Sequence, residues 1–255
     1  MAGRRLEGRV ALVTGSSRGI GAAIARLFAS EGATVAVHGR DRGAVEDVRA
    51  SIEAGGGRAI GVIADVTDFD QIEAMRVEIE ERAGPVDLLV ANAGGNFTAP
   101  GPVEEIPVEA WRKTVDANLT ATFLTLKSFL PGMKQRGRGD IVTISSSAGR
   151  RPHSRSPVPY AAAKSGVQLL TQDVALQVGP FGIRANCIAP ETILTEDNRS
   201  RIPAEVQARL AEAHALRRLG TPEDVARSAL FLACGEESAW ITGIVVDLHG
   251  GTQIQ

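Results

Sequence analysis

The sequence predicts an α/β fold: one doubly wound domain in which helices cover both faces of a seven-stranded parallel sheet. Strand and helix patterns alternate along the chain, which is the order that a parallel sheet with crossover helices requires. The expected strands are short, continuously apolar runs, as in sheets that are buried on both faces. No linker, repeat or low-complexity tract divides residues 1–255, so we expect a single domain.

The first half of the chain is expected to contain four strands and three helices. The strands are predicted at residues 10–14, 34–37, 59–64 and 86–90. In the first helix, Ile20, Ile24 and Phe28 recur on one face, the stripe that a core-facing helix needs. Two further helices are expected over residues 40–54 and 68–83, and a glycine follows each of the three helices and ends it.

The second half repeats this order with longer helices, expected over residues 107 to about 134, 159–178 and 222–233. Strands are predicted at residues 141–144, 183–189 and 243–247. The last helix has a clear beginning, because Thr221 is a preferred capping residue and Pro222 is favoured at the first helical position.

Composition argues against several classes of function. The formal net charge of −2 gives no indication of nucleic-acid or anionic-membrane binding. No apolar stretch approaches the roughly 18 residues that span a bilayer, and the N-terminus lacks the apolar core of a secretory signal. Cys187 and Cys234 lie far apart, and the histidines are scattered. We therefore expect a cytoplasmic protein with reduced thiols and no metal site.

The turn after the first strand carries three glycines in a G-x-x-x-G-x-G pattern and leads into an amphipathic helix. Glycine lets the backbone approach a pyrophosphate, and the helix directs its free N–H groups and positive dipole end at that phosphate. The sequence therefore predicts a Rossmann-type dinucleotide site rather than a turn without a ligand. The residues expected to line it are Gly15, Ser17, Arg18, Gly19, Ile20 and Gly21.

The end of the second strand indicates which dinucleotide is bound. A carboxylate there would bond the ribose 2′-hydroxyl of NAD and repel the 2′-phosphate of NADP. This chain reads His38-Gly39-Arg40, with no carboxylate before Asp41. The forked guanidinium of Arg40 suits a phosphate, with Arg18 as a second cation. We expect NADP(H) rather than NAD(H); the alternative is that Arg40 is a solvated cation at the start of a helix.

Tyr160, the only tyrosine of the chain, precedes Lys164 by four residues, which places both side chains on one helix face. A phenol titrates near 10, and lowering its pKa to about 7 requires roughly 4 kcal/mol. One ammonium at ~4 Å supplies about that much at an effective dielectric of about 20. We therefore expect Lys164 to lower the pKa of Tyr160, and a hydroxyl from the serines at 145–147 to bond the substrate oxygen.

The chain closely resembles the short-chain dehydrogenase/reductase family, from about residue 6 to the C-terminus, in the glycine-rich turn at 14–21 and in Asn92, Ala93, Gly94, Ser146, Tyr160 and Lys164. The resemblance implies hydride transfer between a nicotinamide and a carbonyl or alcohol carbon. It implies that Tyr160 donates and accepts the proton and that Lys164 holds the nicotinamide ribose. By the same resemblance, Ser146 orients the carbonyl, and Asn118 helps to hold a water that links Lys164 to solvent.

The resemblance also implies further contacts with the cofactor. Asp65, which Val66 follows after the third strand, would bond the adenine. The residues Asn92, Ala93 and Gly94 would line the cofactor beside the fourth strand. The contacts near the nicotinamide would come from Pro190, Ile193 and Thr195.

Two departures from the family pattern stand out. Glu191 follows Pro190 where the family often has glycine, which puts a carboxylate near the nicotinamide and leaves the path of the loop open. The family's serine usually lies thirteen residues before the tyrosine, which selects Ser147. If the strand at residues 141–144 is aligned with the family's strand, Ser146 is selected instead, and the loop at 150–159 has one extra residue. We expect Ser146 to be the serine that orients the substrate.

The substrate is less well defined. The chain looks most like 3-oxoacyl-acyl-carrier-protein reductases, and Lys134, Arg136 and Arg138 could dock an acidic carrier. Against this, Phe181 stands where such reductases often carry a basic residue. The alternatives are an NAD(H)-dependent sugar or alcohol dehydrogenase of the same family and a non-catalytic NADP-binding sensor, which would be expected to lose the tyrosine, lysine or serine. Residues 191–219 are expected to form the substrate lid.

The long helices that begin near Pro107 and Pro159 have more apolar surface than one sheet face needs. In the family that this chain resembles, such helices pack against a second subunit. We therefore expect a homotetramer that acts on a small-molecule carbonyl, alcohol or acyl thioester.

Overall fold

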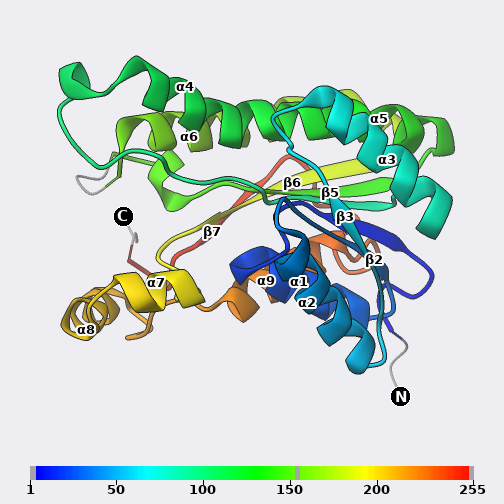
Figure 1. Ribbon diagram of the computed structural model, residues 1–255, viewed down its shortest axis with the longest axis horizontal. Coiled ribbons are helices and arrows are strands. Elements are labelled where there is room, and N and C mark those ends of the chain that lie inside the picture. The colour runs from blue at the N-terminus through cyan, green and yellow to red at the C-terminus, as the bar shows by residue number, and fades with distance from the viewer. Residues whose placement is uncertain (1–3, 153–155, 253–255) are drawn as a thin grey trace.

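Seven parallel strands form one sheet in the part of the chain that the structure describes, residues 4–152 and 156–252 of a computed structural model (Figure 1). The strand order is β3-β2-β1-β4-β5-β6-β7. The sheet confirms the predicted fold class, and the order reverses between β1 and β4, where folds of this kind bind ligands. The strands are β1 Val10–Val13, β2 Thr34–Gly39, β3 Arg58–Ile63, β4 Leu88–Ala91, β5 Gly139–Ile144, β6 Ile183–Pro190 and β7 Val245–Leu248.

Helices cover both faces of the sheet (Figure 1). One layer consists of α1 Gly19–Ser30, α2 Arg42–Ala54 and α9 Pro222–Ala233. The opposite layer consists of α3 Phe69–Ala83, α4 Val108–Val115, α5 Ala121–Arg136 and α6 Val158–Val178. Two short helices, α7 Glu196–Arg201 and α8 Ala204–Ala213, follow the carboxyl end of β6.

Burial on both faces explains why the strands are continuously apolar. On one face, Val35 of β2 belongs to a core cluster with Phe28 of α1 and Leu230 of α9. On the other face, Leu12 of β1 belongs to a cluster that includes Phe129 of α5. Each large side chain that is fully buried contributes about 1.5–3 kcal/mol. The two cores therefore fix the strand ends, on which the functional residues stand.

The helix predicted over residues 40–54 begins at Arg42. The side chain of Asp41 accepts a hydrogen bond from the Ala44 N–H at 3.2 Å, which satisfies one of the free donors of the first turn. Arg40 therefore lies before the helix, in the turn that follows β2.

The helix predicted over residues 107–134 is divided into α4 and α5 by one π-helical turn, Asp116–Thr120. At this turn the Asn118 side chain points inward and donates hydrogen bonds to the carbonyls of Thr114 and Gly95, both at 2.7 Å. Gly95 belongs to the loop after β4, so a contact distant in sequence accompanies the break. Local apolar periodicity carries no signal for such a contact, although π turns often occur at functional sites.

Among the described residues, no helix has both the length and the apolar character that a bilayer span requires. Cys187 and Cys234 are both buried, and neither is in a disulfide.

Candidate active site

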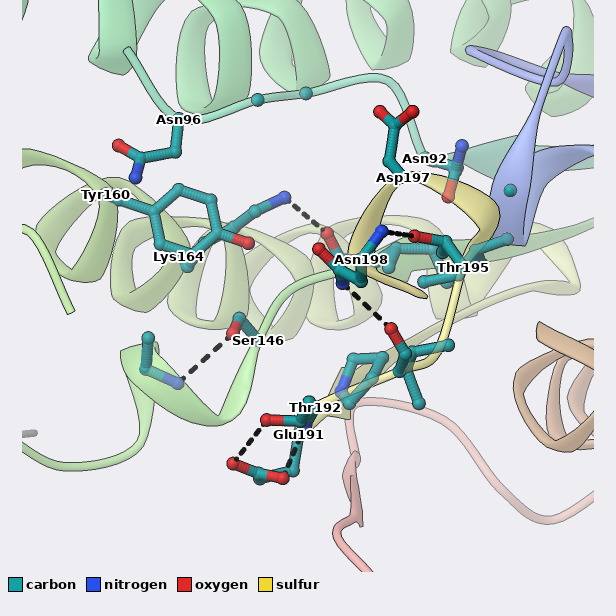
Figure 2. A pocket seen from close by; sticks show the side chains of 18 of the residues that line it. Asn92, Asn96, Ser146, Tyr160, Lys164, Glu191, Thr192, Thr195, Asp197 and Asn198 are labelled. Atoms are coloured by element: carbon teal, nitrogen blue, oxygen red, sulfur yellow. Dashed lines mark hydrogen bonds between the residues drawn. The ribbon is translucent and has the colours of Figure 1, made fainter. Parts of the chain in front are cut away.

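A cavity of ≈ 1050 Å³ lies at the carboxyl ends of β1, β4, β5 and β6 (Figure 2). Its walls come from the glycine-rich turn, the loop after β4, the start of α6 and residues 191–219, which we call the α7–α8 segment. Parallel strands end at one edge of the sheet, so residues that are far apart in the sequence meet there.

The glycine-rich turn has the shape that a pyrophosphate needs. Gly15 has a φ of 64°, and a Cβ at this residue would lie 2.9 Å from the Cα of Ala93. Arg18 is the N-cap of α1 and makes no capping hydrogen bond through its side chain within the described chain, and the first turn of α1 contains no acidic residue. The N–H groups and the positive end of α1 are therefore available to an anion. This turn fits the predicted dinucleotide.

His38, near the end of β2, supports the glycine-rich turn. Its Nδ1 accepts a hydrogen bond from the Gly15 N–H at 2.9 Å, and its Nε2 lies 3.1 Å from the Ala64 carbonyl oxygen. Because Nδ1 accepts and a carbonyl can only accept, the ring is the neutral tautomer with hydrogen on Nε2. Burial lowers the pKa of His38 to about 4. The ring therefore stays neutral near pH 7 and keeps its bond to the turn.

We expect His38 to make the protein less stable in acid. The ordinary histidine pKa is 6.5 and that of His38 is about 4. Between these values the unfolded chain binds a proton that the folded protein does not, so stability is lost as pH falls. The loss between pH 7 and pH 4 is about 3 kcal/mol. Urea denaturation of wild type and His38→Asn measures it: the variant should lose about 3 kcal/mol less over this range, and an equal loss in both proteins would contradict the assignment.

Asn92 connects the end of β4 to the glycine-rich turn. Its Nδ2 donates to the carbonyl oxygens of Thr14 at 2.9 Å and Gly15 at 3.1 Å. The Thr14 hydroxyl accepts in return from the backbone N–H groups of Asn92 and Ala93, both at 3.0 Å. Asn92 and Gly94 line the cavity, whereas Ala93 supports the turn from outside the lining.

Arg40 and Asp65 meet beyond the ends of β2 and β3. Arg40 Nη1 lies 3.6 Å from Asp65 Oδ2, and the Arg40 side chain is 74% exposed. Burial alone would raise the pKa of Asp65, but hydrogen bonds from Thr67 and the charge of Arg40 lower it overall. Arg40, Asp65 and Val66 are outside the lining of the cavity. The predicted phosphate-binding arginine is thus open to solvent, with a carboxylate beside it.

Tyr160, Lys164 and Ser146 converge in the cavity, as Figure 2 shows. Tyr160 and Lys164 stand on successive turns of α6, and Ser146 follows β5. Lys164 Nζ donates to the Ile144 carbonyl oxygen at 2.9 Å and lies 5.7 Å from the centre of the Tyr160 ring. A phenol, a hydroxyl and an ammonium therefore surround one part of the cavity.

The protonation of Tyr160 differs from the expectation. Burial raises the pKa of Tyr160, and its contact with the Ser146 hydroxyl opposes that rise. Burial lowers the pKa of Lys164 to about 8. The lowered phenol pKa is not found, because the ammonium is directed at the Ile144 carbonyl and lies beside the ring. Tyr160 therefore keeps its proton, which suits a group that protonates an alkoxide.

The three serines after β5 have different surroundings. Ser145 Oγ donates to the Lys164 carbonyl oxygen at 2.7 Å and accepts from Gln168 Nε2 at 2.9 Å, so it supports α6. Ser146 and Ser147 both line the cavity. The Ser146 hydroxyl opposes the rise in the pKa of Tyr160, which supports Ser146 as the substrate-orienting serine, and the choice between the two serines stays a prediction.

Asn118 lies behind Gly94, close to Lys164. A Cβ on Gly94 would be 2.5 Å from Asn118 Oδ1 and 3.3 Å from Lys164 Nζ. Asn118 is fully buried, and its Oδ1 accepts from the Gly95 N–H at 3.2 Å. The side chain thus joins the π turn to the loop after β4 and brings Asn118 near the ammonium. Its water-holding role stays a prediction.

The end of β6 and the α7–α8 segment form the remaining wall. Pro190, Ile193 and Thr195 line the cavity. Thr195 caps α7 by accepting from the Asn198 N–H at 3.2 Å, and a Cβ on Gly19 would lie 3.3 Å from the Thr195 methyl group. The segment therefore reaches across the cavity to the glycine-rich turn.

Several further residues line the cavity that the sequence did not assign a role in binding or catalysis, although five of them lie in the predicted lid at 191–219. They are an amide, an arginine, two residues after Pro190 and three apolar residues, namely Asn96, Arg151, Glu191, Thr192, Ile202, Val206 and Leu210. Val206 and Leu210 stand one turn apart on α8, a spacing that helical periodicity could have identified. Glu191 turns its carboxylate to His214 Nε2, at 2.9 Å, which defines the loop path that the sequence left open.

Comparison with known proteins finds matches along nearly the whole chain. A family model described as enoyl-(acyl carrier protein) reductase matches residues 15–253. The cis-4-hydroxycyclohexanecarboxylate dehydrogenase of Sinomonas cyclohexanicum is 38% identical over 98% of this chain and 98% of its own.

Two solved structures are similar in fold and sequence. A 3-oxoacyl-[acyl-carrier protein] reductase from Brucella melitensis with bound NAD has a TM-score of 0.89 and 36% identity, over 98% of this chain and 95% of that chain. A 7α-hydroxysteroid dehydrogenase in complex with NADH and 7-oxo glycochenodeoxycholic acid has a TM-score of 0.91 and 32% identity, over 99% of this chain and 98% of that chain. Both bound cofactors lack the 2′-phosphate that Arg40 is predicted to bind.

Proposed function

The chain belongs to the short-chain dehydrogenase/reductase family, and we propose that it transfers a hydride between NADP(H) and a carbonyl or secondary alcohol carbon. It is an oxidoreductase that acts on CH–OH groups. The observation that carries the proposal is the convergence of Tyr160, Ser146 and Lys164 beside a glycine-rich turn that fits a dinucleotide.

The residues of the chain supply the proton transfer. A bound nicotinamide supplies the hydride for reduction and accepts it for oxidation. In reduction, Tyr160 gives its phenolic proton to the substrate oxygen, so the carbonyl becomes an alcohol. The Ser146 hydroxyl donates a hydrogen bond to the same oxygen and orients it. The phenolate left on Tyr160 takes a proton back from water, and oxidation follows the reverse order. Lys164, whose ammonium donates to the Ile144 carbonyl, would hold the nicotinamide ribose.

The preference for NADP(H) rests on Arg40. No carboxylate precedes Arg40 at the end of β2, and its exposed guanidinium can donate hydrogen bonds to a phosphate. Asp65 beside it weakens this attraction, and the NAD and NADH in two related structures support the alternative of an NAD(H)-dependent enzyme.

Arg40→Ala should weaken NADP⁺ binding by about 10-fold, the loss expected when one charge-assisted hydrogen bond near solvent is removed. NAD⁺ affinity should change little, because NAD⁺ has no 2′-phosphate. Titration calorimetry with both dinucleotides measures the two changes. The matched control is Arg42→Ala, which removes an exposed guanidinium two residues further on. An unchanged NADP⁺ affinity in Arg40→Ala would contradict the role of Arg40.

The apolar part of the cavity lining supports a substrate with an apolar body. Ile202, Val206 and Leu210 line it from the α7–α8 segment, and Arg151 adds a cation. A 3-oxoacyl thioester fits this lining, and so does a ring ketone with an anionic group. The ring is favoured by the substrate named for the Sinomonas relative, which is a hydroxycyclohexane with a carboxylate.

Turnover with a substrate panel tests the proposed function. NADPH and NADH oxidation is followed by absorbance with 3-oxoacyl thioesters, sugars, neutral cyclic ketones and ketocyclohexanecarboxylates. Oxidation of NADPH with at least one ketone is the expected result. Dinucleotide binding without turnover across the panel would favour the non-catalytic sensor and overturn the enzyme.

We also propose that the protein acts as a homotetramer in the cytoplasm. Large apolar side chains are exposed on the outer helices, among them Phe123 of α5 and Leu176 of α6, and Trp240 near the C-terminus is 98% exposed. Such surfaces are typical of subunit interfaces. The two buried thiols, neither of which is in a disulfide, fit a reducing compartment.

A further inference from the structure

The side chains of Glu191 and His214 join two parts of the chain that the proposed reaction does not connect. Glu191 directly follows β6, and His214 is the C-cap of α8. Glu191 Oε2 lies 2.9 Å from His214 Nε2. The backbone N–H of Glu191 donates to the Leu248 carbonyl oxygen of β7 at 3.0 Å. Glu191 is therefore fixed to the sheet, and His214 stands at the end of α8, which forms part of the cavity wall.

Both side chains use their polar atoms fully. The Glu191 carboxylate also accepts from the Thr192 N–H at 2.5 Å and from the Thr192 hydroxyl at 3.0 Å. His214 Nδ1 lies 2.7 Å from the Leu210 carbonyl oxygen, which can only accept, so Nδ1 carries a hydrogen. His214 thus contacts Leu210 through one ring nitrogen and Glu191 through the other, at 2.7 Å and 2.9 Å.

The α7–α8 segment has little apolar burial to hold it. Neither α7 nor α8 contains a buried residue. Between residues 194 and 218, His214 is the only buried residue, and it is 3% exposed. The bonds from Leu194 N–H to Gly220 O at 2.8 Å and from Leu216 N–H to Gly250 O at 3.1 Å hold the two ends of the segment. Gln207 of α8 bonds the carbonyls of Arg199 at 3.2 Å and Ile202 at 2.7 Å, which belong to the same segment. The bond between Glu191 and His214 therefore connects the end of α8 to the residue that follows β6.

The position of α8 determines the shape of the cavity. Val206 and Leu210 line the cavity from this helix. The Leu210 carbonyl is the atom that His214 Nδ1 contacts, so the bond acts on the turn that carries an apolar lining residue. A displaced α8 would move this wall and leave Tyr160 in place, because Tyr160 stands on α6.

We propose that Glu191 and His214 are positioning residues that hold α8, and the apolar wall it carries, at a set distance from Tyr160. The consequence for substrate binding rests on the proposed function, whereas the effect on α8 does not. Loss of the bond should weaken the binding of substrates that reach the wall. Dinucleotide binding at the glycine-rich turn should be preserved.

Hydrogen–deuterium exchange of the full chain tests the bond without a substrate. Glu191→Ala and His214→Ala should each speed exchange in residues 204–214 by about 10-fold, while β5 and α6 keep their protection. The double variant should exchange no faster than His214→Ala, which already lacks both the bond to Glu191 and the bond to the Leu210 carbonyl. Glu191→Gln keeps an acceptor and should retain most of the protection. The matched control is Glu212→Ala, which removes an exposed carboxylate from α8.

Unchanged exchange in both single variants, or additive effects in the double variant, would overturn the proposal. If the alanine variants do not fold, Glu191→Met, His214→Phe and their combination remove the same bond while keeping side-chain volume, and the same comparison of single and double variants applies.

Steady-state kinetics tests the consequence for substrate. Both alanine variants should raise KM about 10-fold for a ketone with a ring or acyl body, with a smaller change in kcat. The KM of a three-carbon ketone should rise less, and the Kd of NADPH should be unchanged. Equal losses for large and small ketones would overturn the positioning role. If wild type reduces no ketone, the proposed function fails, while the exchange experiment still decides whether the bond holds α8.

Discussion

Tyr160→Phe should lower kcat for carbonyl reduction by about 10²- to 10⁴-fold, the range for loss of a positioned general acid. The substitution removes the phenolic hydroxyl and keeps the ring that lies beside Lys164 Nζ. The fold and the glycine-rich turn should therefore be unaffected. NADPH absorbance at saturating ketone measures kcat. Thermal unfolding and NADPH titration of the same protein are the controls and should match wild type.

Reduction at the wild-type rate by Tyr160→Phe would refute the proposed proton transfer while leaving the fold intact. The same assay separates the two serines that line the cavity. Ser146→Ala should lose most of its turnover, because Ser146 is the hydroxyl that interacts with Tyr160.

Lys164→Met should abolish most activity and yet stabilise the protein without cofactor. Burial lowers the pKa of Lys164 from the ordinary 10.5 to about 8, so keeping the buried ammonium charged costs about 3 kcal/mol at pH 7. Methionine removes that cost, but the Ile144 carbonyl loses its hydrogen bond from Nζ, worth about 1 kcal/mol. The net gain in the free energy of unfolding is about 2 kcal/mol, measured by urea denaturation at pH 7.

The pH dependence distinguishes this cause from better packing. A lysine with a lowered folded pKa destabilises the protein below that pKa, and the penalty disappears as pH rises from about 8 to 10.5. The advantage of Lys164→Met should therefore shrink toward zero at pH 10. A constant advantage from pH 7 to pH 10 would show that the charge of Lys164 is not the cause.

The order of elements could be predicted from the sequence because its signals are local. The apolar run at 10–14 became β1. The stripe of Ile20, Ile24 and Phe28 became the core-facing side of α1, on which Ile24 and Phe28 are buried and Ile20 is partly buried. Thr221 and Pro222 mark the start of α9, where the structure has a complete capping box. Each of these features depends on neighbours within about one or two turns, so no knowledge of tertiary contacts is needed.

The chemistry of the site could be predicted where one turn or one helix contains it. The glycine-rich turn and the Tyr160–Lys164 spacing are such cases. The pKa of Tyr160 could not be predicted in this way. It depends on the burial of the phenol and on the hydrogen bond that Lys164 donates to the Ile144 carbonyl. The break between α4 and α5 depends in the same way on Asn118 reaching the loop after β4.

The sequence by itself determined a doubly wound sheet, a dinucleotide turn and a tyrosine–lysine pair. It did so because a pattern of apolar side chains and glycines restricts backbone conformation over a few residues. Only the tertiary structure decided that Glu191 faces His214, that Arg40 stands beside Asp65 and that Lys164 contacts Ile144. These pairs join segments that are about 20 or more residues apart, and their energies depend on burial and on distances that exist only once the chain has folded.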